Sequence, residues 1–116
     1  MIHYHGTPIT PNRYIETMAG RHFCVSYAAP AQLPICLRIG ASVMLDNGAF
    51  SAFTRGLPLD VPGFYRWIEP YLAHPHWAVV PDVIGGTVEQ QRAMLATWQR
   101  SMTSFVRWSN EWRNLD

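Results

Sequence analysis

The sequence predicts an α/β fold in which parallel strands alternate with helices. Two short apolar segments, within residues 44–51 and 79–86, each end in an aspartate and then break into glycine. A short apolar run bounded by turn residues is typical of a buried strand. Strands that alternate with helical patterns favour a parallel sheet with right-handed crossovers. Because a complete eight-stranded barrel needs about twice this length of chain, we interpret the sequence as half of a TIM-type barrel.

The first part of the chain predicts two strands joined by a helix. Residues 2–7 form a short strand that runs into a glycine turn. Thr10 is expected to cap a helix that begins at Pro11, because proline is tolerated in a first helical turn. Gly20 then ends this helix, and residues 22–27 form the second strand.

The middle of the chain predicts a short helix from Leu33 to Ile39 and a third strand from Ser42 to Asp46. The first acidic loop follows this strand. Residues 54–63 have glycine and proline at both ends, which is typical of an exposed connection. Asp60 is a candidate cap for the next helix.

In the last part of the sequence, Pro70 lies inside a helical pattern and should kink or shorten that helix. The fourth strand is expected from Trp77 to Pro81. Thr87 and Gln90 have the spacing of a capping box, which predicts the start of a final helix.

Composition limits the class of protein. A chain of 116 residues with 48% hydrophobic residues is expected to fold as one globular domain. Its net charge of +1 gives no general attraction to nucleic acid. The apolar runs are too short to cross a membrane, and residues 1–20 lack the pattern of a signal peptide. Cys24 and Cys36 provide no disulfide framework, so we expect a cytoplasmic protein.

Asp46 and Asp82 are the main candidates for a functional site. Each aspartate lies where a predicted strand meets its loop, and ligands of α/β folds bind at the carboxyl ends of parallel strands. The alternative is a purely structural role, because Asp-Asn-Gly is a strong turn sequence in its own right.

The first acidic segment, Leu45-Asp46-Asn47-Gly48-Ala49-Phe50-Ser51, resembles a motif of the tRNA-guanine transglycosylases. It is more similar to the Asp-Ser/Asn-Gly-Ala-Phe-Ser segment of their phage and bacterial relatives, some of which act in 7-deazaguanine modification of DNA. Residues 81–85 resemble the second acidic loop of that group, and residues 4–8 resemble the opening of its shorter members. The resemblance covers roughly residues 1–98.

The resemblance implies a role for each acidic residue. Asp46 would be the general base or a base contact, and Asp82 would recognise the Watson–Crick edge of a heterocycle. A guanine-like edge offers neighbouring N–H donors, which a carboxylate accepts as charge-assisted hydrogen bonds. Glycines would let the backbone approach the base, and Phe50 would stack on it. The candidate substrate-binding residues are Asp82, Asn47, Gly48, Phe50, Gly85, Gly86 and His5.

The sequence departs from the family in its chemistry. The transglycosylases attack the ribose with an aspartate from the second half of their barrel, but after Asp82 this sequence has only Asp116. The family's zinc-binding cluster is also missing. We therefore expect a non-catalytic, transglycosylase-like binding protein, such as a phage-encoded inhibitor of a host nucleic-acid-handling or defence complex. The alternative is an enzyme that acts on a guanine or 7-deazaguanine base or nucleoside.

A third hypothesis comes from His5-Gly6-Thr7, which resembles the opening of ADP-ribosyltransferases that use NAD. Such an enzyme needs a glutamate on a later strand, whereas Glu69, Glu89 and Glu111 lie in segments with helical patterns. The five histidines have no adjacent acidic or cysteine partner, so we expect neither a metal nor a cofactor.

The domain prediction divides the chain in two. Residues 1–100 should form the half-barrel, and residues 101–116 an aromatic tail that joins the same domain or binds a partner. Trp108 and Trp112 would share one face if the tail is helical. Because a half-barrel has two open sheet edges and an uncovered apolar face, we expect self-association or a protein partner.

Overall fold

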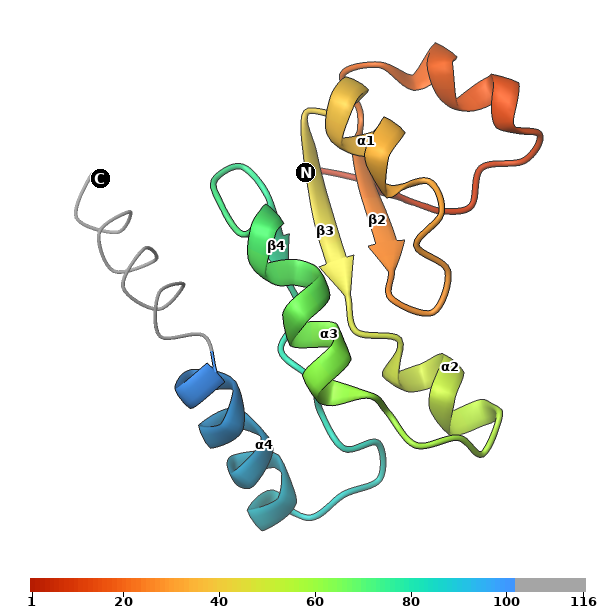
Figure 1. The fold of residues 1–116 in the computed structure, drawn as a ribbon. Helices are drawn as coiled ribbons and strands as arrows, with labels where there is room; N and C mark the ends of the chain where they lie inside the picture. Colours follow the sequence, from red (N-terminus) through yellow and green to blue (C-terminus); the bar gives the residue numbers. More distant parts are fainter. Residues whose placement is uncertain (102–116) are drawn as a thin grey trace.

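A computed structural model describes residues 1–101, in which a four-stranded sheet alternates with helices (Figure 1). The predictions for Trp108 and Trp112 lie outside the described residues. In chain order, the elements are β1 (Tyr4–Gly6), the 3₁₀ helix η1 (Asn12–Met18), β2 (His22–Ser26), α1 (Leu33–Ile39), β3 (Ser42–Asp46), α2 (Ala49–Thr54), α3 (Val61–Ile68), the 3₁₀ helix η2 (Glu69–Tyr71), β4 (Trp77–Ala78) and α4 (Val88–Ser101).

The sheet is parallel, and its strands lie in the order in which they occur in the chain, β1-β2-β3-β4. The strands β2 and β3 pair along their whole length, from His22 opposite Ser42 to Ser26 opposite Asp46. This architecture confirms the predicted α/β class with parallel strands and intervening helices.

One face of the sheet carries the core. Side chains alternate between the two faces of a strand, and every second residue of β2 and β3 is fully buried, namely Phe23, Val25, Val43 and Leu45. These four side chains belong to one cluster with residues of η1, α1, α3 and α4, which include Ile15, Cys36, Phe64, Ile68 and Trp98. The helices α1 and α3 therefore cover the same face of the sheet (Figure 1).

The opposite face carries polar and aromatic side chains at the amino ends of the strands. The Trp77 indole of β4 donates to the Tyr4 hydroxyl of β1 at 3.0 Å, although these strands are not neighbours. The Ser42 hydroxyl donates to the same oxygen at 3.4 Å and is also hydrogen-bonded to His22 Nδ1. One residue from each strand therefore joins a network across this end of the sheet.

Most local predictions are confirmed. The helix Leu33–Ile39 and the strand Ser42–Asp46 have the predicted bounds. The capping box is reciprocal, because Gln90 N–H donates to Thr87 Oγ1 and Thr87 N–H donates to Gln90 Oε1. As expected from Pro70, α3 ends at Ile68 and a 3₁₀ turn follows.

Three local predictions are wrong. Thr10 does not cap η1, because Pro11 has extended backbone angles and itself occupies the cap position. The helix α2 (Ala49–Thr54) begins inside the first acidic segment, where the sequence predicts a loop after Asp46. The fourth strand ends at Ala78 rather than at Pro81, since the following carbonyls bind a side chain and not the backbone of β3.

Within the described part of the chain, no helix combines the length and the apolar character that crossing a membrane requires.

Two adjacent residues of α3 test the account of the core. Tyr65 is 5% exposed, and its hydroxyl has no hydrogen-bond partner among residues 1–101. Since an unpaired buried hydroxyl is unfavourable, Tyr65→Phe should leave the free energy of unfolding unchanged or raise it by about 1 kcal/mol. Phe64→Ala should lower it by about 3–5 kcal/mol, because a fully buried ring is lost. Urea denaturation measures both, and a clear loss of stability in Tyr65→Phe would contradict this account.

Candidate functional site

Asp46 is the last residue of β3 and lies on the sheet face that the helices of residues 1–101 do not cover. By the alternation of side chains along the strand, Asp46 shares a face with Ser42 and Met44, and the buried Val43 and Leu45 lie on the other face. Its charge acts on Cys24 of β2, whose pKa is raised first by burial and then by Asp46. The Asp46 carboxylate is partly exposed and makes no hydrogen bond or ion pair within residues 1–101. It is therefore available to a ligand.

Asp82 is exposed in the loop that follows β4, the strand next to β3. It lines a groove of about 230 Å³ whose other walls come from α2, residues 57–61, the Asp82 loop and α4. Its carboxylate also has no hydrogen-bond or ion-pair partner in the described range of the chain. Apolar residues such as Phe53, Leu57 and Met94 form most of this groove.

Asn47 ties the two acidic loops together. Its Nδ2 donates to the carbonyls of Val79 and Val80, at 3.3 and 3.4 Å, and its Oδ1 accepts from Ala49 N–H at 2.8 Å. The residue is 3% exposed, so its amide is committed to the protein's own backbone. The position next to Asp46 therefore has a structural role, because it holds the end of β3 beside the segment that leads to Asp82.

The glycines of the two loops allow backbone conformations or close contacts that a larger residue would not. Gly48 precedes α2 with a φ of 77°, and a Cβ atom there would lie 3.2 Å from the backbone nitrogen of Ala28. Gly85 has a φ of 72°, and a Cβ atom on Gly86 would lie 2.8 Å from the Val83 side chain. Each glycine is thus required by a turn or by close packing. A role in approaching a ligand stays a prediction for all three.

Phe50 and His5 are the remaining candidate residues. Phe50 is 72% exposed on α2, which begins inside the first acidic segment. His5 lies on the edge strand β1, where its ring contacts those of His3 and Phe23. Its pKa is lowered by desolvation and by the charges of His3 and Arg21. A ligand-binding role for either residue stays a prediction.

The ADP-ribosyltransferase hypothesis gains no support from the glutamates that the structure describes. Glu16, Glu69 and Glu89 lie in η1, η2 and α4, and none of them is on a strand. Glu111 is outside the described residues. Among residues 1–101, no group of three or more His, Cys, Asp or Glu side chains has an arrangement that could hold a metal ion.

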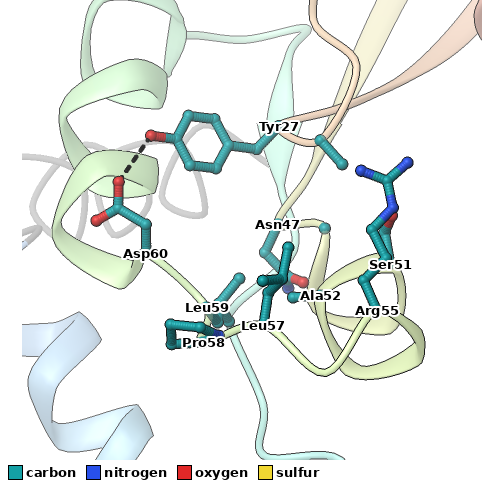
Figure 2. Close-up of a pocket in the computed structure, with 11 residues that line it drawn as sticks. Tyr27, Asn47, Ser51, Ala52, Arg55, Leu57, Pro58, Leu59 and Asp60 are labelled. Atoms are coloured by element: carbon teal, nitrogen blue, oxygen red, sulfur yellow. Dashed lines mark hydrogen bonds between the residues drawn. The ribbon is translucent and has the colours of Figure 1, made fainter.

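A pocket of about 200 Å³ opens at the carboxyl ends of β2 and β3 (Figure 2). On one side, the Tyr27 hydroxyl donates to Asp60 Oδ2 at 3.1 Å, and Asp60 Oδ1 caps α3 by accepting from Gly63 N–H. Ser51 of α2 and Arg55, the residue that follows this helix, lie on the opposite side. Burial, followed by the hydrogen bond and the charge of Asp60, raises the pKa of Tyr27, so its hydroxyl stays a donor. Asn47 and Gly48 also line this pocket, whereas Asp46 and Asp82 do not.

The sequence did not reveal Tyr27, Arg55 or Asp60 as residues that line a pocket. Asp60 was predicted as a helix cap, which is confirmed. Its contact with Tyr27 joins residues 33 positions apart, so no local pattern could indicate it.

Comparison with known proteins finds no matching protein-family model, no matching curated protein and no matching solved structure. The resemblance to transglycosylases therefore rests on the motifs of the sequence and stays a prediction.

Removal of the Asn47 side-chain amide tests whether its hydrogen bonds to Val79 and Val80 hold the two acidic loops together. Asn47→Ala should lower the free energy of unfolding by about 2–3 kcal/mol, because two carbonyls and one N–H lose their partner. Ser51→Ala, in the neighbouring helix, is the control and should change stability by no more than about 0.5 kcal/mol. Thermal and urea denaturation measure both variants. Equal stability of Asn47→Ala and wild type would show that the link is not needed.

Gly63 tests the wall of the pocket. A Cβ atom at this position would overlap Asp60 Oδ2 and the Tyr27 hydroxyl. Gly63→Ala should therefore separate Tyr27 from Asp60, lower stability by about 1–3 kcal/mol and bring the pKa of Tyr27 closer to its ordinary value. Ultraviolet titration of the tyrosines measures the pKa. Gly6→Ala is the control, since a Cβ atom there meets nothing within 4 Å. An unchanged Tyr27 titration in Gly63→Ala would be the contrary result.

Proposed function

We propose that the carboxyl edge of this sheet binds a guanine-type base, and that the protein acts through this binding rather than by glycosyl transfer. One observation carries the proposal. Asp46 ends β3, and Asp82 lies in the loop that follows the neighbouring parallel strand β4; neither carboxylate has a partner in residues 1–101. The Asn47 side chain, next to Asp46, donates to the carbonyls of Val79 and Val80 in the second acidic segment.

The chemistry of the edge suits a guanine or 7-deazaguanine base. Both heterocycles present adjacent N–H donors on one edge, and an ionised carboxylate has only acceptor sites. Hydrogen bonds of this type are stronger than those between neutral groups. Asp82 is proposed as the acceptor for the base edge, and Asp46 as a second contact at the end of β3.

The sheet supports the further proposal that the chain is a segment of a TIM-type barrel. Its four strands are parallel and in sequential order, and the helical core covers one face. In such barrels the strands follow one another in this way, the helices lie outside, and the active site is at the carboxyl ends of the strands. Asp46 would then face the interior of the barrel.

Within residues 1–101 the same arrangement leaves one sheet face without helices, and we propose that self-association or a protein partner covers it. Its described residues include Tyr4, Cys24, Met44 and Trp77, and Trp77 is 40% exposed. An interaction protein of the inhibitor type would use this face together with the base site.

Calorimetric titration of the full chain with guanosine and 7-deazaguanosine tests the base site, with adenosine as the control ligand. Asp46→Asn and Asp82→Asn should each weaken binding about tenfold or more, because one charge-assisted hydrogen bond contributes about 1.5–3 kcal/mol. Asp60→Asn is the matched control, since this carboxylate at the same edge already accepts from Tyr27 and Gly63. It should leave the affinity unchanged.

Three outcomes would contradict the proposal. Absence of heat with both nucleosides, in a protein shown to be folded, would show that the protein does not bind the base. Loss of binding in Asp60→Asn alone would show that the ligand binds in the pocket beside Tyr27 instead. Release of free base from guanosine by the wild type, abolished in Asp46→Asn, shows an enzyme in place of a binding protein.

A further inference from the structure

The strand β4 has only two residues, and side chains hold it to β3 at both ends. Its backbone pairing with β3 consists of Trp77 opposite Met44 and Ala78 opposite Leu45. Asn47 binds the carbonyls that follow the strand. At the start of the strand, the Val43 N–H donates to Nδ1 of the His76 imidazole at 3.0 Å. The imidazole therefore takes the place of the backbone carbonyl that would accept the Val43 N–H if β4 were longer.

This hydrogen bond requires one protonation state of His76. An imidazole nitrogen accepts a hydrogen bond only when it carries no proton, and both nitrogens of the charged ring are donors. Protonation of His76 would therefore place an N–H group against the Val43 N–H. Val43 is fully buried, so its amide would lose its partner in a place that water does not reach.

Among residues 1–101, the groups that act on the pKa of His76 disfavour its charged form. The residue is partly buried, and its pKa is lowered first by burial and then by the charge of His74. Two further titratable groups at this end of the sheet, Tyr4 on β1 and His22 on β2, are hydrogen-bonded to Ser42, the residue before Val43. None of the groups that shift the pKa of His76 is a carboxylate.

We propose that His76 is an acid-sensitive latch, which holds β4 against β3 while its imidazole is neutral and releases the strand when the imidazole takes a proton. Release would free the start of a strand whose backbone pairing is short. Because the second acidic loop follows β4, the latch also determines how firmly the Asp82 loop is held at the other end. The proposal concerns the strand itself and does not depend on the identity of any ligand.

The sign of the pH effect follows from the lowered pKa. Below the ordinary histidine value of about 6.5 the unfolded chain binds a proton at His76 before the folded chain does. The contribution of this residue to stability is therefore complete above that pH. It decreases as the pH falls from there toward the lower pKa of the folded state.

Hydrogen exchange of the Val43 amide, followed by NMR on the full chain, tests the latch. Between about pH 7.5 and about pH 5, the protection factor of Val43 relative to that of Val25 should fall on the order of tenfold. His76→Asn supplies an acceptor that does not titrate in this range, so its relative protection should be independent of pH. His3→Asn is the control, because His3 lies at the same end of the sheet and its ring contacts that of His5, and it should behave like the wild type.

Three results would each overturn the proposal. The first is a constant relative protection of Val43 in the wild type, and the second is an equal fall in His76→Asn. The third is an NMR titration of the His76 ring with a midpoint at or above about 6.5. The ring titration uses the wild type alone, so it decides the question even if His76→Asn does not fold.

Discussion

The attachment of β4 to β3 is the constraint on which the geometry of the carboxyl edge of the sheet depends. A strand of two residues makes few backbone hydrogen bonds, and this one lies at the edge of the sheet. Two side chains extend its pairing, since His76 accepts from β3 before the strand begins and Asn47 donates to its chain after it ends. Together with the hydrogen bond from Val79 N–H to the Leu45 carbonyl at 2.9 Å, these contacts hold the start of the loop that carries Asp82 beside the end of β3.

The two faces of the sheet have separate roles. Strict alternation in β2 and β3 directs Phe23, Val25, Val43 and Leu45 into one apolar cluster with the helices. Burial of these side chains, each favourable by about 1.5–3 kcal/mol, gives the fold its main stabilisation. The other face is free to carry polar groups. At the amino ends of the strands it holds a hydrogen-bonded network around the Tyr4 hydroxyl, and at the carboxyl end of β3 it holds Asp46.

The sequence predicts the parts of this fold that depend on local patterns. The strand Ser42–Asp46, the cap at Asp60 and the capping box of α4 follow from alternation, turn residues and fixed spacing. The helix α2 was missed because Asp-Asn-Gly indicates a turn, and that turn leads directly into a helix through the left-handed Gly48. The predicted β4 was too long, because the Asn47 side chain, in the loop after β3, donates to the carbonyls of Val79 and Val80.

The same limit applies to the site. Asp46 and Asp82 could be selected from sequence because each ends an apolar run, and the parallel sheet does put their strands side by side. The contacts that organise the edge join residues 32 or 33 positions apart, as in Asn47 with Val79 and Tyr27 with Asp60. Nothing in the local sequence of either partner specifies such a pair. These contacts depend on the register of the strands, which only the assembled sheet defines.

The central claim is that the joined acidic loops form one ligand site at the carboxyl edge of the sheet. An amide chemical-shift map of the labelled full chain, recorded during titration with 7-deazaguanosine, tests it most directly. The account predicts that the largest shifts occur together in residues 46–51 and 79–86. Saturable shifts confined to another region, such as the groove between α3 and α4, or shifts in one acidic loop without the other, would contradict it.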